Sequence, residues 1–514
     1  MISEAPQKSK NFAEIASTIA FVLAVAVAVY LRFYLLEIKP LHHDEGVNSH
    51  FLLNLLRQGQ YKYDPNNYHG PSLYYFTFLS VKILGESEFA LRFFPALCGV
   101  LTVALMWGLR QGLGLVGTPV AAWSLALSPG LVYFSRDFIH ESSFVFFMVG
   151  MIVAAYHWKK PSSIFWFSIF TGLLFTTKET SLHTSLVLIA SVLCAVVWDI
   201  IRDYLAGRRN GMPSFELAPL FYQGLLNLSI FLPIFVTIYL VLYTSFFTNP
   251  SGPLDFLKSV FQWTGRGFNE HIHDHVWSYY LGILIKLELP LVIAGVIGFG
   301  LTLWRGSRFG LFLMAWAYGM VIGYSRIPYK TPWLMVSMVT ALAVFSGYAA
   351  QLIFDLLKFR VPRLIFVGLL LLIIYPVFKM SYTVNMIKYE DNNNETGYFA
   401  KFGKEKNFTA YTDTQYGYVY AQTNDTAKDL FAEVDRINPD KIFYITRDYW
   451  PLPWYLRKYE VSGYEDAAPE GFEGKLLIAA KSQEEETFRK LKGRYTAKTF
   501  TLRPALEIVL FIKD

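Results

Sequence analysis

The chain has 514 residues, of which 54% are hydrophobic, 17% aromatic and 17% charged, whereas a soluble globular domain carries about 25% charged residues. This composition excludes a soluble enzyme of one aqueous compartment, and it also excludes disordered and collagen-like chains. The charges are unevenly spread, because 40 of the 86 Lys, Arg, Asp and Glu residues lie within 385–514. We therefore expect a transmembrane domain over 1–384 and an extracytoplasmic, periplasmic α/β domain over 385–514.

The formal net charge of +6 is divided in the same way, with an excess of eight basic residues in 1–384 and of two acidic residues in 385–514. No basic run with interleaved aromatic residues occurs, so nucleic acid is not an expected partner. The two cysteines, Cys98 and Cys194, provide neither a disulfide framework nor a metal-binding spacing. The excess of basic residues in 1–384 is better explained by membrane topology, which places Lys and Arg in cytoplasmic loops.

A transmembrane helix needs about 20 predominantly apolar residues, and the sequence predicts about eleven. The first has no small-residue cleavage site after it, so we interpret it as an anchor rather than a removed signal peptide. The fifth and sixth are separated only by Lys178-Glu179. The predicted spans lie near 16–36, 89–109, 115–134, 138–157, 162–177, 181–198, 221–247, 279–303, 309–324, 332–354 and 362–382.

The charged residues between the spans predict the orientation. With a cytoplasmic N-terminus, the loops rich in Lys and Arg face the cytoplasm, as the positive-inside rule requires. Residues 71–84 are apolar but too short to cross, and counting them as a span would invert every later loop. We expect them to lie at the outer membrane surface. The predicted cytoplasmic cations are Lys8, Lys10, Arg110, Lys159, Lys160, Arg202, Arg208, Arg209, Arg305, Arg308, Lys358, Arg360 and Arg363.

The charged C-terminal segment alternates between two kinds of pattern. Residues 441–446, 475–480 and 506–512 are short runs rich in β-forming residues, whereas 424–437 and 482–492 have helical spacing. This alternation predicts a small α/β domain.

The first predicted external loop begins with His42-His43-Asp44-Glu45. Carboxylates near hydrocarbon cost several kcal/mol unless they are paired or used. One of them can act as a general base on an acceptor while its neighbour orients the acceptor, sets the pKa or holds a metal. The alternative is a solvated loop whose acids cap the following helix. His69, later in the same loop, is either a turn residue or part of the site.

The second external loop, 135–141, contains Arg136, Asp137 and Glu141 between two apolar runs. Arg136 could bind an anion while Asp137 or Glu141 binds hydroxyl groups, or these charges could pair internally. The same choice, between function and an ion pair joining two helix ends, applies to Lys178-Glu179.

Two later external loops are also charged. Residues 271–275 read His-Ile-His-Asp-His, which either binds a divalent metal or is solvated, and the spacing fits no standard zinc pattern. Arg326 and Lys330 lie in a proline-containing loop. They either snorkel at the membrane surface or bind the phosphate of a lipid-linked substrate, and we favour the phosphate because the positive-inside rule disfavours cations there.

These features resemble the GT-C class of membrane glycosyltransferases, in particular protein O-mannosyltransferases and lipid A aminoarabinose transferases. Within it, the chain is most similar to a prokaryotic subgroup labelled flippase-activity-associated proteins. The double histidine before Asp44 departs from the simpler mannosyltransferase pattern, which leaves acceptor type and metal dependence open. The motifs that carry the resemblance are Asp44-Glu45 within 42–75, GESEFALRFFPALCGVLTVAL (85–105), YFSRD (133–137), PYKTPWL (328–334) and WPLPWYLRKYE (450–460).

The resemblance implies an α-helical multi-pass GT-C fold in the inner cell membrane and an enzyme that moves a sugar from a polyprenyl-phosphate donor to a protein, lipid or glycan acceptor. Asp44 would be the general base and Glu45 its partner in an inverting displacement. The alternatives are a non-catalytic transporter or flippase partner for lipid-linked sugars and, on weaker grounds, an ion transporter. The implied lipid-phosphate ligands are Arg136, Arg326 and Lys330, and the candidate sugar or acceptor ligands are His43, His69, Asp137 and Glu141.

Overall fold

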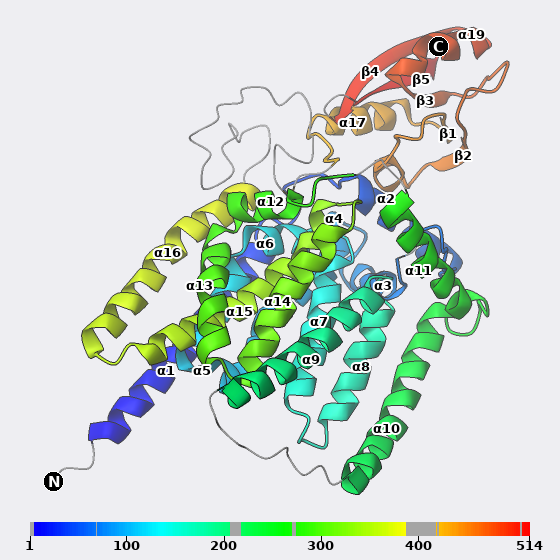
Figure 1. Cartoon of the computed structure of the whole chain (residues 1–514). Helices are drawn as coiled ribbons and strands as arrows, with labels where there is room; N and C mark the ends of the chain where they lie inside the picture. Colours follow the sequence, from blue (N-terminus) through cyan, green and yellow to red (C-terminus); the bar gives the residue numbers. More distant parts are fainter. Residues whose placement is uncertain are drawn as a thin grey trace.

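The computed structural model describes residues 5–67, 69–205, 217–269, 274–386, 418, 421–503 and 506–514. A bundle of apolar helices carries a smaller domain at one end (Figure 1). The long helices of the bundle are α1 (Ala5–Phe33), α4 (Glu88–Ala104), α5 (Arg110–Leu127), α7 (Glu141–Tyr156), α8 (Ser163–Phe175), α9 (Ser181–Leu205), α10 (Leu217–Tyr243), α13 (Leu289–Arg305), α14 (Arg308–Arg326), α15 (Met335–Leu356) and α16 (Arg360–Met386).

The centre of the bundle is α15, which is buried over nearly its whole length, whereas α10 and α16 lie at the periphery and expose apolar side chains. Helices whose outward faces are apolar suit a lipid environment. By length and composition, six of the described helices can cross a membrane, or seven if α12 (Tyr279–Leu287) and α13 form one bent span. The protein is thus a multi-pass membrane protein, while the total of eleven spans stays a prediction.

Two predicted spans are interrupted. In the predicted run 115–134, helix α5 ends at Leu127 and a second helix, α6 (Pro129–Ser135), follows it. The Ser128 hydroxyl caps α6, and Pro129 is its first residue. The predicted run 279–303 consists of α12 and α13, which meet at 108° beside Glu288. Polar residues at these breaks therefore lie inside the bundle.

A sharp break lies within α5. The chain stays helical from α4 through η1 (Leu105–Leu109) into the first residues of α5, and the helix breaks at Gly114, where φ is +80°. A side chain is strained at this φ, and a Cβ there would also lie 2.5 Å from the Gln351 side chain. The Gln351 Oε1 atom accepts hydrogen bonds from the Val116 and Gly117 amides, which caps the helix that follows.

Shorter helices lie between the long ones, and some of them gather near the smaller domain (Figure 1). Predicted segment 71–84 forms a 13-residue helix, α3, whose residues Leu79, Ile83 and Leu84 are exposed. Further elements of the helical domain are α2 (His43–Gln58), α3 (Ser72–Leu84), α11 (Gly252–Asn269) and η2 (Pro332–Leu334).

The C-terminal domain is built on a five-stranded sheet of order β2-β1-β3-β5-β4, parallel between β1 and its neighbours and antiparallel around β5. The sequence predicted its three buried or central strands, but it missed the edge strands β2 and β4, which lack apolar runs. Its elements are α17 (Ala427–Ile437), β1 (Lys441–Tyr444), α18 (Leu452–Tyr455), β2 (Glu460–Tyr464), β3 (Leu476–Ala480), η4 (Lys481–Gln483), α19 (Glu484–Lys490), β4 (Tyr495–Arg503) and β5 (Leu506–Lys513).

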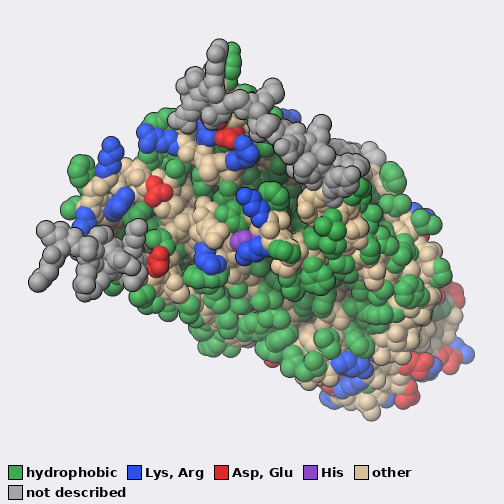
Figure 2. Space-filling model, turned by 90° about the horizontal axis from the view of Figure 1, so that it is seen from below, with side chains coloured by type: hydrophobic (Ala, Val, Ile, Leu, Met, Phe, Trp, Pro, Cys, Tyr) green, Lys and Arg blue, Asp and Glu red, His purple; other side chains and the backbone are tan. Residues whose placement is uncertain are grey.

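The predicted fold class, a helical membrane domain followed by an α/β domain, is therefore confirmed. The face of the bundle away from the C-terminal domain shows several Lys and Arg side chains on an otherwise largely apolar surface (Figure 2). Exposed cations at this end of the helices include Arg110, Lys159, Lys160, Arg305 and Arg308.

Candidate active site

Asp44 lies in the first turn of α2, which begins at His43 after the extended backbone of His42. Its side chain is 31% exposed, and its Oδ1 atom lies 3.0 Å from Nδ1 of His43. Burial tends to raise the pKa of the Asp44 carboxyl, but the His43 hydrogen bond and the nearby charges of His42 and His43 lower it to about 2. Asp44 is therefore an accessible carboxylate at neutral pH, as a proton acceptor must be.

Glu45, the neighbour of Asp44, is buried and fully engaged. Its two carboxylate oxygens each lie 2.7 Å from Arg92 of α4, and Oε1 also accepts the amide of Phe138 at 2.8 Å. Oε2 accepts the amide of His42, so this acid caps α2 as the alternative interpretation proposed. Burial opposes ionisation, but Arg92 holds the pKa of Glu45 well below its usual range.

Arg92 extends this contact to the chain that precedes α2. The guanidinium donates three hydrogen bonds to this segment and two to the Glu45 carboxylate, so it fixes the position of the segment relative to α4. Its backbone acceptors are the carbonyl oxygens of Leu36, Lys39 and Pro40.

Arg136, predicted to bind lipid phosphate, caps the C-terminal end of α1. It is 5% exposed, and such a cation satisfies helix carbonyls that have no intrahelical partner. The N–H groups of Arg136 that donate to these carbonyls are already occupied. A bound phosphate would therefore interact with the positive charge of Arg136. The acceptors are the carbonyl oxygens of Leu31, Arg32, Tyr34 and Leu35.

Asp137 lies beside this network, partly buried, where the charges of Glu45 and of Lys39 both act on it. Burial, and then the negative charge of Glu45, raise the pKa of the Asp137 carboxyl to about 6. Asp137 and Asp44 therefore titrate in very different pH ranges within one neighbourhood.

The predicted residues Glu141 and His69 belong to a second group of contacts. Glu141 forms a buried ion pair with Lys178 at 2.7 Å, so this pair does join two helix ends. His69 Nδ1 lies 3.3 Å from Glu179, and the His69 ring lies 4.8 Å from that of His140. The charge of His69 also acts on Asp44, which places the two side chains in one region.

The two cations of the loop after α14, Arg326 and Lys330, differ in their exposure and in their contacts. Lys330 is 1% exposed and donates to the carbonyl oxygens of His275, Ile327 and Pro328. Arg326 is exposed at the end of α14. Within the part of the chain that the structure describes, the hydrogen bonds of Lys330 go to its own loop and to His275, whereas Asp44 bonds His43.

A divalent metal would need several donor groups around one point. Among the described residues, no group of three or more His, Cys, Asp or Glu side chains is arranged to hold a metal ion. His271 and His273, part of the predicted metal motif, lie outside the described residues. The metal site stays a prediction.

The C-terminal domain also contacts this site, which the sequence did not predict. The hydroxyl of Tyr455 accepts a hydrogen bond from the amide of Leu41 at 2.8 Å and donates one to Oε1 of Glu88 at 2.5 Å. Gly46 faces Pro451 so closely that a Cβ would lie 2.7 Å from it. The motif at 450–460 was recognised, but only the fold shows that it packs on α2, because its partners are some 400 residues away.

The chain shares its fold with proteins of known structure. Residues 68–202, which include Arg92, Arg136 and Lys178, match the family model of dolichyl-phosphate-mannose-protein mannosyltransferases. The chain is also similar to ArnT from Cupriavidus metallidurans bound to undecaprenyl phosphate, with 15% identity and a TM-score of 0.61, over 95% of this chain and 97% of that chain. The fold is the GT-C fold.

The GT-C likeness includes the C-terminal domain. The apo state of the same ArnT gives a TM-score of 0.62 at 14% identity, over 96% of this chain and 98% of that chain. None of the curated proteins matches the sequence. The predicted resemblance to the GT-C class is thus confirmed, whereas membership of the flippase-activity-associated subgroup stays a prediction.

Replacing Glu45 with Gln should destabilise the folded protein. The substitution removes the nearest counter-charge of the buried Arg92 and leaves the more distant Glu88 at 3.6 Å, and breaking a buried pair costs about 3–5 kcal/mol. We expect a clear fall in the thermal unfolding midpoint of the purified protein. Asp466→Asn, which breaks an exposed pair with Arg447, is the matched control and should change the midpoint little. Equal shifts for the two variants would contradict the role given to Glu45.

Replacing Tyr455 with Phe should loosen the start of the Asp44 loop. The change removes only the hydroxyl that bonds Leu41 and Glu88. We expect faster hydrogen exchange at the backbone amides of 41–46, measured by mass spectrometry on the full chain. Tyr459→Phe, which removes a hydroxyl bonded to Asp435 within the C-terminal domain, should leave those amides unchanged. Unaltered exchange in Tyr455→Phe would refute the contact.

Proposed function

We propose that the protein transfers a sugar from a polyprenyl-phosphate carrier to an acceptor on the extracytoplasmic side of the membrane. One observation carries this proposal: a GT-C fold that presents an accessible, ionised carboxylate, Asp44, on a loop anchored by the buried Glu45–Arg92 pair. The binding of undecaprenyl phosphate by ArnT, which has the same fold, supports a polyprenyl phosphate as the lipid carrier.

In the proposed reaction, Asp44 takes the proton from an acceptor O–H or N–H group. The acceptor atom then attacks C1 of the sugar, and the bond between C1 and the phosphate oxygen breaks. The electron pair leaves with the lipid phosphate, and the configuration at C1 is inverted. Asp44 acts without a prior loss of its own proton, because its low pKa keeps it ionised.

The leaving phosphate gains negative charge, which nearby cations stabilise. We assign this role to Arg136, Arg326 and Lys330. Arg326 is exposed and can bind the phosphate directly, whereas Arg136 and Lys330 contribute charge from positions where backbone carbonyls orient them. Asp137, with His43, His69 and Glu141, would face the sugar or the acceptor.

The orientation in the membrane follows from the distribution of cations. The exposed Lys and Arg residues at the bundle face away from the C-terminal domain (Figure 2) are what the positive-inside rule expects of a cytoplasmic face. We therefore propose a cytoplasmic N-terminus, an inner-membrane location and an extracytoplasmic C-terminal domain. Asp44 would then share the outer side with that domain.

Asp44→Asn should abolish transfer while preserving lipid binding. Loss of a general base lowers rates by about 10²–10⁴-fold, and the neutral amide still fits the loop. Sugar transfer from polyprenyl-phosphate donors and binding of undecaprenyl phosphate would be measured on the same purified protein. Asp64→Asn, in the segment between α2 and α3, is the control. A wild-type protein that moves such donors across vesicles but transfers no sugar would instead be a flippase.

The pH profile should report Asp137 rather than Asp44. The pKa of Asp137 is raised to about 6, so this carboxyl is neutral below that pH and charged above it. The pKa of Asp44, at about 2, keeps it charged throughout. We expect kcat/KM of the wild type to change with a midpoint near pH 6, where Asp137 changes its charge. In Asp137→Asn, kcat/KM should stay constant from about pH 5 to about 8. A change near pH 6 that persists in the variant would exclude Asp137 as its source.

A further inference from the structure

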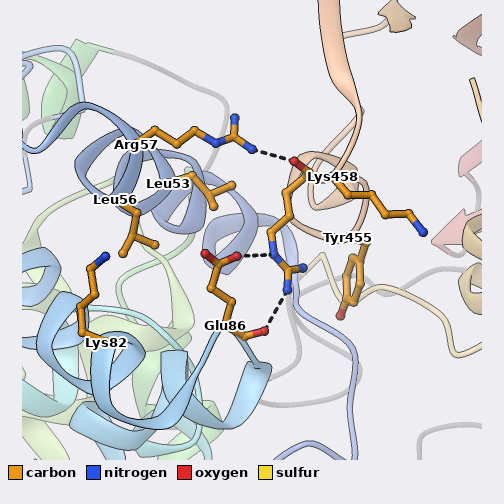
Figure 3. A pocket seen from close by; sticks show the side chains of 8 residues that line it. Leu53, Leu56, Arg57, Lys82, Glu86, Tyr455 and Lys458 are labelled. Atoms are coloured by element: carbon orange, nitrogen blue, oxygen red, sulfur yellow. Dashed lines mark hydrogen bonds and ion pairs between the residues drawn. The ribbon is translucent and has the colours of Figure 1, made fainter. Parts of the chain in front are cut away.

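A cavity of about 490 Å³ lies between the helical domain and the C-terminal domain, and Asp44 is not among the residues that line it. It is bounded by the C-terminal end of α2, the end of α3 and the segment after α18 (Figure 3). We propose that this cavity binds the phosphate-bearing headgroup of an anionic membrane lipid. This binding is separate from sugar transfer and does not depend on it.

The cavity wall is strongly cationic. Arg57 comes from α2, Lys82 from α3, and Arg457 and Lys458 from the C-terminal domain, whereas Glu86 is the one acid among the described residues that line the cavity. Lys458 is matched by Asp435, which lies 2.9 Å away and outside the lining. The remaining excess of positive charge favours an anion, and phosphate is the anion that Arg and Lys bind most readily at membrane surfaces.

The acid is already matched by one of these cations. Glu86 lies 2.9 Å from Nε of Arg457. Arg57 is exposed and donates to the backbone oxygen of Arg457 at 2.7 Å, and Lys82 is exposed over the ring of Phe78. Within the described residues, neither Arg57 nor Lys82 forms an ion pair. Their charge remains available for a ligand.

The surroundings indicate a lipid rather than a soluble anion. Lys82 lies on α3 among the exposed apolar residues Leu79, Ile83 and Leu84, of which Ile83 is 71% exposed. Leu53 and Leu56 of α2 add an apolar wall to the cavity itself. A headgroup phosphate between the cations would leave the acyl chains over the apolar side of α3, which is the arrangement of an interfacial amphipathic helix.

Such a lipid would join the two domains close to the active-site loop. Tyr455, which holds Leu41 and Glu88, lines the same cavity as Arg57 and Lys82. The headgroup would therefore contact both the transmembrane helices and the segment of the C-terminal domain that packs on α2.

The test measures lipid binding to the full-length protein by native mass spectrometry. Phosphatidylglycerol is the anionic probe and phosphatidylcholine the zwitterionic one. We expect the wild type to bind phosphatidylglycerol more tightly, and Arg57→Gln with Lys82→Gln to weaken this binding about tenfold or more. Arg57→Lys with Lys82→Arg keeps both charges and should retain the binding. Lys159→Gln with Lys160→Gln removes two exposed cations from the opposite end of the bundle and is the matched control.

Three results would overturn the proposal. The first is equal retention of phosphatidylglycerol by the two charge-removing variants, and the second is equal affinity for the two lipids. The third is displacement of phosphatidylglycerol by inorganic phosphate at equal concentration, which would identify a site for a free anion. None of these measurements requires sugar transfer, so they are independent of the activity test on Asp44.

Discussion

The loop that carries Asp44 depends on the buried ion pair between Glu45 and Arg92. Two charges in an apolar helical domain are costly unless each is matched and hydrogen-bonded, and here both oxygens of Glu45 contact the guanidinium while backbone groups take the remaining bonds. The pair joins α2, α4 and the second loop at Phe138. Asp44, one residue away in the first turn of α2, is thereby held in place by contacts to α4 and to the second loop.

The same constraint explains the other buried charges. Arg136 uses carbonyls at the end of α1, Lys330 uses carbonyls of its own loop, and Glu141 pairs with Lys178. Charges that satisfy one another in this way position the loops, whereas Asp44 retains exposure and the proton-accepting form. Structural and chemical roles are thus divided between neighbouring residues, and the difference in pKa between Asp44 and Asp137 follows from the same arrangement.

The C-terminal domain belongs to this arrangement. The Tyr455 hydroxyl connects the segment before α2 to Glu88 of α4, which also lies 3.6 Å from Arg92. A contact network therefore runs from the C-terminal domain to Glu45. The cationic cavity adjoins the same tyrosine, so a lipid bound there would touch the network at its outer end.

The sequence by itself determined the division into an apolar and a charged segment, the helical membrane fold and the α/β character of the C-terminal domain, because hydropathy and periodicity are local properties. It also singled out Asp44 through two adjacent acids after an apolar run. Only the tertiary structure decided that Glu45 is buried against Arg92 and that Arg136 binds the end of α1. Those partners are remote in the chain, and the choice between an available charge and a satisfied one depends on contacts that no local pattern contains.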